Sequence, residues 1–296
     1  MSHHHHEHHH SHHHHDASQI SKTKLFWVVL MNLLITVAEF IGGILSGSLA
    51  LLSDALHNLS DTIAILLSYV SIRLSSKSAN ERKMFGYKRA NILSAFINSA
   101  VLLALSVYLS FEAVQRFIHQ ETVNGNTVII VSLIGLVANL VSVLLLSKDS
   151  KHSLNIRSSY LHLMSDMVSS VIVLFSGIMI KYFHVYWIDP VFTIIINILI
   201  VKSVYSVLKE SIHILMEGSP ENISIEEMKK ELKTIENVID ITEVKAWSLD
   251  DNHICIELKM KIEDMKISES NQIKHKIEHI LEEHYGARDF IIEFTS

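Results

Sequence analysis

The sequence predicts a membrane protein of six transmembrane helices, followed by a small α+β domain in the cytosol. Six apolar segments are each long enough to cross a bilayer. After Pro220 the pattern changes to the short amphipathic segments of a soluble domain. Charge changes nearby, because the chain has 15 basic and 12 acidic residues up to Glu210 but 10 and 19 beyond it. We therefore expect a His-rich tail over residues 1–20, a membrane domain over 21–210 and a cytosolic domain over 211–296.

Basic residues orient the apolar segments, because Lys and Arg accumulate on the cytosolic side of membrane proteins. In a six-span arrangement, eleven basic residues at or beyond the segment ends fall on one side, and only Arg116 and Lys181 fall on the other. We therefore expect a multi-pass protein of the cell membrane, with both termini in the cytosol. The segments are Leu25–Leu45, Leu49–Leu74, Ala90–Val114, Thr127–Ser147, Ser158–Phe183 and Asp189–Leu208.

Two local motifs mark helix ends. Asp is a favourable N-cap and Pro suits the first helical position, so Asp189-Pro190 predicts the start of the sixth helix. Gly43 and Gly47, four residues apart near the end of the first segment, favour close approach of neighbouring helices. We expect both motifs to serve packing.

The chain beyond Pro220 predicts a compact domain in the order helix, strand, strand, helix, strand. Apolar residues follow helical spacing from Ile225 to Ile235 and again from Ile273 to Leu281. Apolar residues alternate along Ile254–Ile262, as in a half-buried strand, and Val238–Leu249 and Phe290–Phe294 are the other strands. This αββαβ order favours helices on one face of a sheet. Such apolar strands also favour self-association.

Composition excludes several classes of partner. The acidic second part argues against nucleic acid, and the sequence has no glycine-rich phosphate loop for a nucleotide. Cys255 is the only cysteine, so no intrachain disulfide exists and a thiolate site for copper(I) is disfavoured. The first residues are histidines rather than a basic and then apolar segment, so we expect no cleavable signal peptide.

The strongest functional signal is a repeated His-x-x-x-Asp pair inside two apolar segments: His57 with Asp61, and His162 with Asp166. Residues four positions apart share one face of a helix. A carboxylate at the centre of a membrane helix costs about 2.5–3.5 kcal/mol on insertion scales. Two imidazoles and two carboxylates are a suitable tetrahedral ligand set for zinc. We therefore predict one metal site shared by the second and fifth segments.

Charge balance favours a metal over the alternative of polar packing between helices. Two ionised aspartates and two neutral histidines around a dication sum to zero, which lowers the cost of burial. Ser and Thr would suffice for hydrogen bonds between helices. Without the ion, the same side chains take up protons, so metal and proton compete for the same atoms. Such competition is the chemistry of exchange transport.

Other polar residues in the apolar segments leave alternatives open. Asp54 has one of three roles. It accepts a hydrogen bond from an imidazole that binds the metal, it lines the ion pathway, or it caps a helix end at the membrane interface. Asn58 either tunes the site or serves packing, and packing is the favoured interpretation. Glu39 and Glu112 are costly in a membrane, so each is either functional or placed where its carboxylate reaches water.

The first fifteen residues contain eleven histidines interrupted by Ser and Glu. The string is either a native tail or a purification tag, and the interruptions favour a native tail. Its imidazoles would bind zinc weakly and raise the local ion concentration.

With these motifs in place, the chain resembles the cation diffusion facilitator family, in particular its bacterial zinc, cobalt and cadmium efflux members. The resemblance covers about residues 20–296. The matching stretches are Ala50–Asp61, Gly86–Arg89, Ser153–Asp166, Asp189-Pro190 and Ile214–Pro220.

The resemblance implies a metallochaperone-like cytosolic domain, a homodimer, and zinc/proton antiport out of the cytosol. It also implies that His57, Asp61, His162 and Asp166 are the four metal ligands, in a combination associated with zinc. The chain departs from the family pattern in the cytosolic domain, because Thr242 and Lys245 stand where relatives have His.

Glu257 and Asp289 likewise replace histidines that relatives often have. A weak cytosolic metal site, rich in carboxylates or shifted in position, would therefore use His253, Glu257 and Asp289.

We therefore predict a zinc exporter, with cobalt or cadmium tolerated, whose partners are divalent ions, protons, the lipid bilayer and a second copy. An intramembrane zinc hydrolase is disfavoured, because the segments lack an H-E-x-x-H string. The remaining alternative is a membrane-anchored metal sensor or buffer that uses the His-rich tail and the cytosolic domain.

Overall fold

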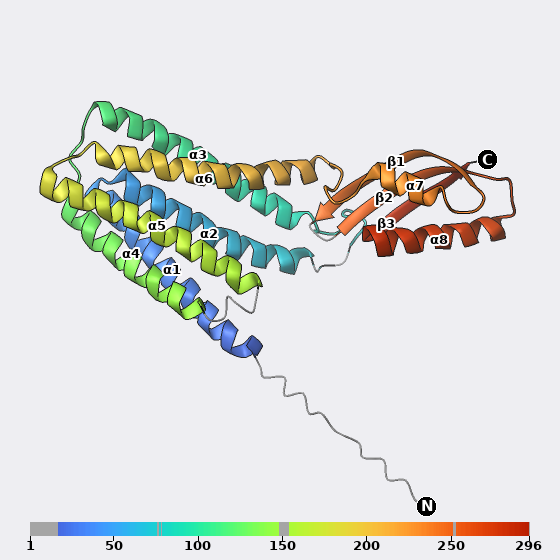
Figure 1. Cartoon of the computed structure of the whole chain (residues 1–296), viewed down its shortest axis with the longest axis horizontal. Helices are drawn as coiled ribbons and strands as arrows, with labels where there is room; N and C mark the ends of the chain where they lie inside the picture. The colour runs from blue at the N-terminus through green and yellow to red at the C-terminus, as the bar shows by residue number, and fades with distance from the viewer. Residues whose placement is uncertain (1–16, 76, 78, 148–153, 251–252, 296) are drawn as a thin grey trace, which may run out of the picture. The chain divides into compact units, whose positions relative to one another are not determined.

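The computed structural model describes residues 17–75, 77, 79–147, 154–250 and 253–295. Among them, six helices are long and apolar enough to cross a membrane, as predicted. They are α1 (Ala17–Ser46), α2 (Leu49–Ser75), α3 (Ala90–Ile118), α4 (Gly125–Leu146), α5 (Leu154–Phe183) and α6 (Ile188–Leu215) (Figure 1). The predicted His-rich string, residues 1–15, lies outside the described residues.

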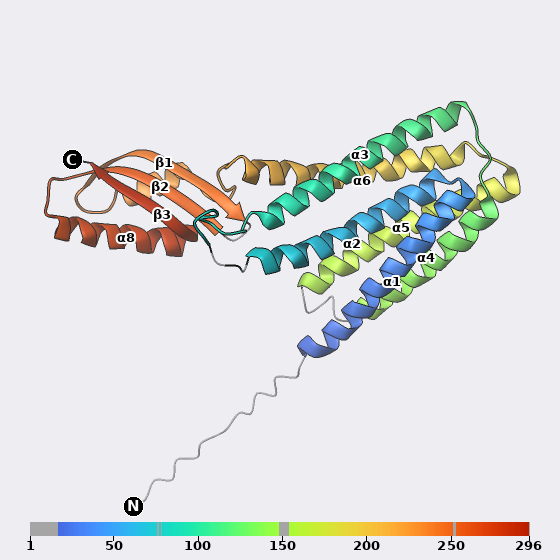
Figure 2. The same ribbon diagram turned by 180° about the vertical axis from the view of Figure 1, so that it is seen from behind.

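Contacts divide the chain into two compact units. Among the described residues, one unit lies within 17–59 and 113–193, and the other within 60–112 and 194–295. Helix α2 contributes residues to both. Within the first unit, α4 packs against both α1 and α5, which lie alongside it in both views (Figures 1 and 2).

The start of α2 is held by a carboxylate from the start of α6. Asp189 is 1% exposed, and its Oδ2 accepts hydrogen bonds from the backbone N–H groups of Leu49 (2.7 Å) and Ala50 (3.4 Å). Its Oδ1 accepts a hydrogen bond of 2.5 Å from the Ser48 hydroxyl. Helix α6 begins at Ile188, so the predicted start is confirmed, but the interpretation of Asp189 as the cap of its own helix is wrong. Its carboxylate caps α2, where an anion complements the helix dipole.

The two glycines near the end of α1 have different roles. Gly47 has φ of +72°, a left-handed conformation that glycine adopts at little cost, and it forms the turn between α1 and α2. Gly43 lies against α2, since a Cβ there would come within 3.1 Å of the Leu52 backbone nitrogen. Close helix approach therefore depends on Gly43, whereas Gly47 provides the turn.

The C-terminal domain has the predicted αββαβ order (Figures 1 and 2). The sheet order is β1-β2-β3, with β1 and β2 antiparallel and β2 and β3 parallel. Helix α8 connects the two parallel strands. The elements are α7 (Ile225–Leu232), β1 (Val238–Asp250), β2 (His253–Ile262), α8 (Ile267–Tyr285) and β3 (Ala287–Thr295).

One face of this sheet forms the domain core. Ile256, Leu258 and Met260 alternate along β2 and are at most 1% exposed. They pack in one cluster with Met228 and Leu232 of α7 and with apolar residues of α8. Both helices therefore cover the same face, as the alternation in the sequence predicted.

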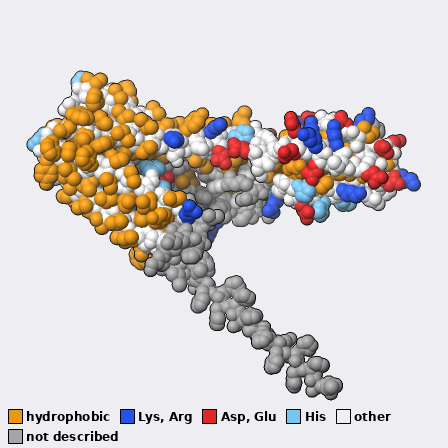
Figure 3. Space-filling view, viewed as in Figure 1, with side chains coloured by type: hydrophobic (Ala, Val, Ile, Leu, Met, Phe, Trp, Pro, Cys, Tyr) orange, Lys and Arg blue, Asp and Glu red, His pale blue; other side chains and the backbone are white. Residues whose placement is uncertain are grey.

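Side-chain chemistry differs between the helices and this domain. On the face shown in Figure 3, hydrophobic side chains cover the helices, whereas acidic and basic side chains gather over the C-terminal domain. Large apolar side chains such as Leu45 (73% exposed) and Leu34 (63%) point outward from α1. Apolar surface this extensive is suited to lipid contact, while the charged surface is suited to water.

A carboxylate joins α7 to the end of α8. Glu231 accepts hydrogen bonds from the Tyr285 hydroxyl (2.7 Å) and from His284 Nδ1 (2.5 Å). The hydrogen bond from Tyr285, helped by His284, lowers the pKa of Glu231. Burial and the neighbouring Glu231 raise the pKa of Tyr285 to about 12.

The lowered Glu231 pKa predicts a loss of stability in acid. The stabilisation is fully present above pH 4.5, the ordinary pKa of a glutamate, and is lost as the pH falls through the lower folded-state value. Replacing Tyr285→Phe removes the main cause of the shift, so the melting temperature of this variant should fall less than that of the wild type when the pH is lowered from 6 to about 3. Thermal unfolding of the full chain in detergent measures this difference. Equal falls in both proteins would contradict the prediction.

Candidate metal centre

Helix α2 carries a polar stripe inside an apolar span. Asp54, His57 and Asp61 follow one another at intervals of three and four residues, so they lie along one side of the helix. Asp54 is 1% exposed, whereas His57 and Asp61 are half-buried. Polar and ionisable side chains in a membrane helix face other helices or a water-filled cavity rather than lipid.

Helix α5 brings the second predicted pair to this stripe. The ring of His57 meets the ring of His162 edge to face, with 6.1 Å between the ring centroids. His162 Nε2 lies 3.6 Å from Asp166 Oδ2, one helical turn further along α5. The structure therefore places His57, His162 and Asp166 together, and Asp61 stands on α2 one turn beyond His57.

Atoms suited to a metal are withdrawn from solvent at all of these positions except His162. His57 Nδ1, one carboxylate oxygen of Asp61 and both carboxylate oxygens of Asp166 are buried. The His162 side chain is 39% exposed, whereas the Asp166 side chain is 1% exposed, so one residue of the pair on α5 reaches solvent and the other is buried. Imidazole nitrogens and carboxylate oxygens are donors that suit zinc.

The structure places Asp54 and Asn58, whose roles the sequence left open, in different contacts. Asp54 Oδ1 accepts a hydrogen bond from the Ser169 hydroxyl, three residues beyond Asp166 on α5. Its Oδ2 is buried and has no hydrogen-bond partner among the described residues. The Asn58 amide instead donates to Glu39 Oε2 of α1, over 3.1 Å. Asp54 therefore links the two helices that carry the His and Asp pairs, and Asn58 links α2 to α1.

A second group of potential ligands lies in the C-terminal domain. His253, Cys255 and Asp289 each offer one atom within 4.8 Å of the others. His253 Nε2 lies 2.5 Å from Asp289 Oδ2, and Lys88 Nζ, from the loop before α3, lies 2.6 Å from His253 Nδ1. The imidazole of His253 therefore lies between an ammonium and a carboxylate group.

Cys255 is the member of this cluster that sequence reasoning did not select. Its spacing of two residues from His253 is the signal that could have found it, because such residues share one face of a strand. Burial, together with the nearby Asp289 carboxylate, raises the pKa of the Cys255 thiol to about 11. The thiol therefore keeps its proton at neutral pH, and a metal would have to displace that proton.

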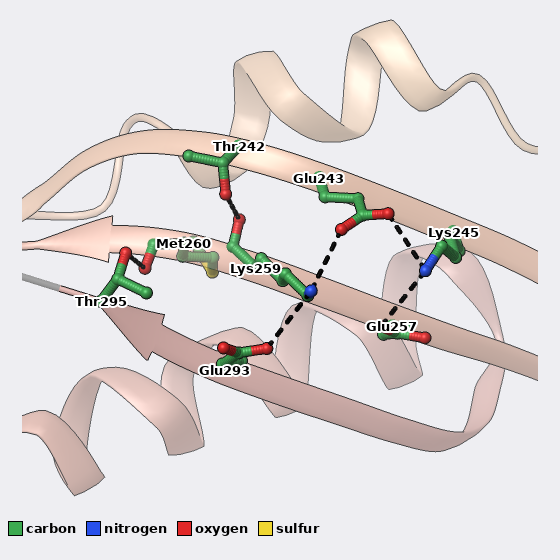
Figure 4. A network of polar contacts seen from close by, with 8 residues as sticks. All are labelled: Thr242, Glu243, Lys245, Glu257, Lys259, Met260, Glu293 and Thr295. Atoms are coloured by element: carbon green, nitrogen blue, oxygen red, sulfur yellow. Dashed lines mark hydrogen bonds and ion pairs between the residues drawn. The ribbon is translucent and has the colours of Figure 1, made fainter.

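The structure does not bring Glu257, the third predicted cytosolic residue, into this cluster. Glu257 lies 3.5 Å from the Lys245 ammonium, within a network of charges on the outward face of the sheet (Figure 4). In the same network, Lys259 pairs with Glu243 and Glu293. Glu257 thus has a structural partner of opposite charge.

Both the helical part and the C-terminal domain of the chain match models of known protein families. Residues 25–216 match the model of the cation efflux transmembrane domain. Residues 220–294 match the model of the cation efflux protein cytoplasmic domain. Together the two matches cover the six apolar helices and the αββαβ domain.

Several curated transport proteins are similar to this chain over most of their own length. The cadmium, cobalt and zinc/H(+)-K(+) antiporter of Bacillus subtilis is 41% identical, over 88% of this chain and 84% of its own. The zinc transporter ZitB of Pectobacterium atrosepticum is 39% identical, over 72% and 67%. The probable proton-coupled zinc antiporter SLC30A4 of the mouse is 29% identical, over 93% and 70%. These matches confirm the resemblance drawn from the motifs, and the chain belongs to the cation diffusion facilitator family of cation efflux proteins.

Proposed function

We propose that this protein exports zinc from the cytosol in exchange for protons. The observation that carries the proposal is the approach of His57 on α2 to His162 on α5, beside the buried Asp166. Asp61 completes the set, because it lies four residues from His57 on the same side of α2. Relatives named as zinc antiporters and zinc transporters support the same cargo.

The proposed ligand set explains the exchange. When zinc is bound, two carboxylates and two neutral imidazoles balance its charge, and the site is neutral within the membrane. When zinc leaves, the buried carboxylates and imidazoles are left without a cation, and protons from the outer side replace it. Protons and metal therefore alternate on the same atoms, and an inward proton gradient drives zinc outward.

Asp54 acts outside the ligand set in this proposal. Its hydrogen bond with Ser169 ties α2 to α5 at the level of the His and Asp pairs. Movement of the two helices past one another, as alternating access requires, must strain or break this contact. Asp54 is therefore a residue of the pathway and of helix coupling rather than a metal ligand.

The proposal extends to the arrangement of the whole chain. The membrane domain spans residues 21–210, the cytosolic domain 211–296, and the His-rich tail 1–20. Both termini lie in the cytosol of a cell whose plasma membrane holds the protein as a homodimer. The excess of Lys and Arg on one side of the six spans and the match to a cytoplasmic domain support this orientation.

Flux in liposomes tests the function. The purified protein, reconstituted with an acidic lumen, should take up zinc from a neutral medium, and a protonophore should abolish the uptake. Cadmium and cobalt should compete with zinc, whereas manganese, which prefers oxygen ligands, should compete poorly. Zinc uptake that does not respond to the proton gradient would contradict antiport.

A second candidate function is a metal sensor or buffer anchored in the membrane. The cluster of His253, Cys255 and Asp289 favours it. Zinc at this cluster would displace the Lys88 ammonium from His253 and the proton from Cys255.

The two functions predict different behaviour of a His253→Ala, Cys255→Ser variant. For an exporter, this variant still carries zinc across liposome membranes, and only its regulation or its extra zinc binding changes. For a sensor, the wild type carries no zinc, and the variant loses zinc binding at the domain. Zinc flux and equilibrium zinc binding, measured on both proteins, separate these outcomes.

A further inference from the structure

Glu39 is a buried carboxyl group of α1 that the proposed transport cycle does not use. Its side chain has no exposed surface, so it does not reach water at a membrane boundary. A carboxylate in a membrane helix costs about 2.5–3.5 kcal/mol on insertion scales. A group kept in the interior at that cost is expected to make specific contacts.

Two contacts hold the Glu39 carboxyl group between three helices. Its Oε2 accepts a hydrogen bond from the Asn58 amide of α2, over 3.1 Å. Its Oε1 lies against Gly135 of α4, where a Cβ would come within 2.5 Å of it. The carboxyl group therefore occupies space that exists only because residue 135 is a glycine.

Asn58 is placed to control how α2 is turned about its axis. It directly follows His57, and successive helical residues point about 100° apart, since a turn takes 3.6 residues. His57 and Asp61 therefore share one side of α2, while Asn58 points to α1. Asp54, one turn earlier and on nearly the same side as Asn58, is bonded to Ser169 of α5. Helix α2 is thus held by two hydrogen bonds, one to α1 and one to α5, within one turn of His57.

A small rotation of α2 would be enough to spoil a metal site. Side-chain tips lie roughly 5 Å from the helix axis, so a rotation of roughly 20° moves them by nearly 2 Å. Zinc sites tolerate deviations of only about 0.2 Å in ligand distance. The hydrogen bond that fixes the rotation therefore matters more for zinc binding than for the fold.

We propose that Glu39 is a positioning residue for zinc, which acts by holding Asn58 and so aiming His57 and Asp61 at the ion. The inference rests on the proposed function, because it concerns the same zinc site. It states that a hydrogen bond between two residues that do not bind zinc keeps the zinc ligands in position. The hydrogen bond, rather than the charge of Glu39, is what the site requires.

Transport kinetics of four variants in liposomes test this role. Glu39→Ala and Asn58→Ala should each raise the KM for zinc about tenfold or more, as loss of an outer partner of a metal ligand does. The maximal rate should change much less. The double variant should be no worse than either single one, since both remove the same bond. Glu39→Gln keeps a carbonyl acceptor for Asn58 and should stay close to the wild type.

Asn197→Ala is the matched control. Asn197 is also a buried amide, 1% exposed, and it joins α6 to α3 through hydrogen bonds to Ser106 O (3.2 Å) and Ser110 Oγ (3.1 Å). Its loss should lower thermal stability as much as that of Asn58, but leave the KM for zinc unchanged.

Each result decides the question. Equal loss in Glu39→Gln and Glu39→Ala overturns the inference, because the charge or a proton is then what the site requires. An unchanged KM in Asn58→Ala, or a raised KM in Asn197→Ala, overturns it as well. If the wild type carries no zinc, the proposed function fails and this inference fails with it. If the wild type carries zinc and the variants behave as it does, the inference alone fails.

Discussion

Replacing Asp61→Ala should reduce zinc-driven proton flux to the background of protein-free liposomes. The change removes one of the two negative charges that balance the dication, so the loaded site would carry a net positive charge within the membrane. Burying an unbalanced charge is far more costly than losing a hydrogen bond. It also removes one of four ligands from a tetrahedral ion, together with a group that takes up protons when zinc leaves. The measurement is lumenal pH, followed with a fluorescent dye after zinc is added outside.

Two further variants make this test specific. Asp61→Asn keeps an oxygen ligand but loses the charge, so it should also fail to couple zinc to protons. Asp264→Ala, in the exposed turn before α8, makes the same chemical change outside the helices and should transport like the wild type. Flux above background in Asp61→Ala, at normal protein levels, would remove Asp61 from the ligand set.

The features predicted correctly are those encoded by residues close together in the sequence. The six membrane helices follow from long apolar segments, and the αββαβ domain follows from periods of two and 3.6 residues. The His-x-x-x-Asp pairs are also local, since His57 with Asp61, and His162 with Asp166, each need only a helix to align them. The approach of His57 to His162 joins two such patterns, and the metal site that the two pairs would share stays a prediction.

What could not be predicted depends on contacts between distant parts of the chain. The hydrogen bond between Glu39 and Asn58 requires the particular rotation of two neighbouring helices, which no local pattern fixes. Cys255 was set aside because a lone cysteine forms neither a disulfide nor a thiolate cluster. Its position beside His253 and Asp289 depends on parallel pairing of β2 with β3, in which Cys255 lies opposite Asp289.

Asp189 combines both cases, because its place at the start of α6 is local but its partners lie 140 residues away. Replacing Asp189→Ala should lower the free energy of unfolding by roughly 3 kcal/mol, the scale of a hydrogen bond to a charged group plus buried donors left unsatisfied. Ser48 and the backbone N–H groups of Leu49 and Ala50 would lose their acceptor in a buried position. Thermal unfolding of the detergent-solubilised protein measures the loss.

Asn124→Ala is a control that shows how much of the effect of Asp189→Ala comes from the burial of its hydrogen bonds. Asn124 caps α4 by accepting hydrogen bonds from the backbone N–H groups of Asn126 and Thr127, but it is exposed, so water can replace it. Its loss should cost about 1 kcal/mol, as for an ordinary N-cap. Asp189→Asn should fall between the two, because an amide oxygen still accepts one of the hydrogen bonds. If Asp189→Ala is no less stable than Asn124→Ala, the carboxylate of α6 does not anchor α2, and the helix that carries His57 and Asp61 must be fixed by its other contacts.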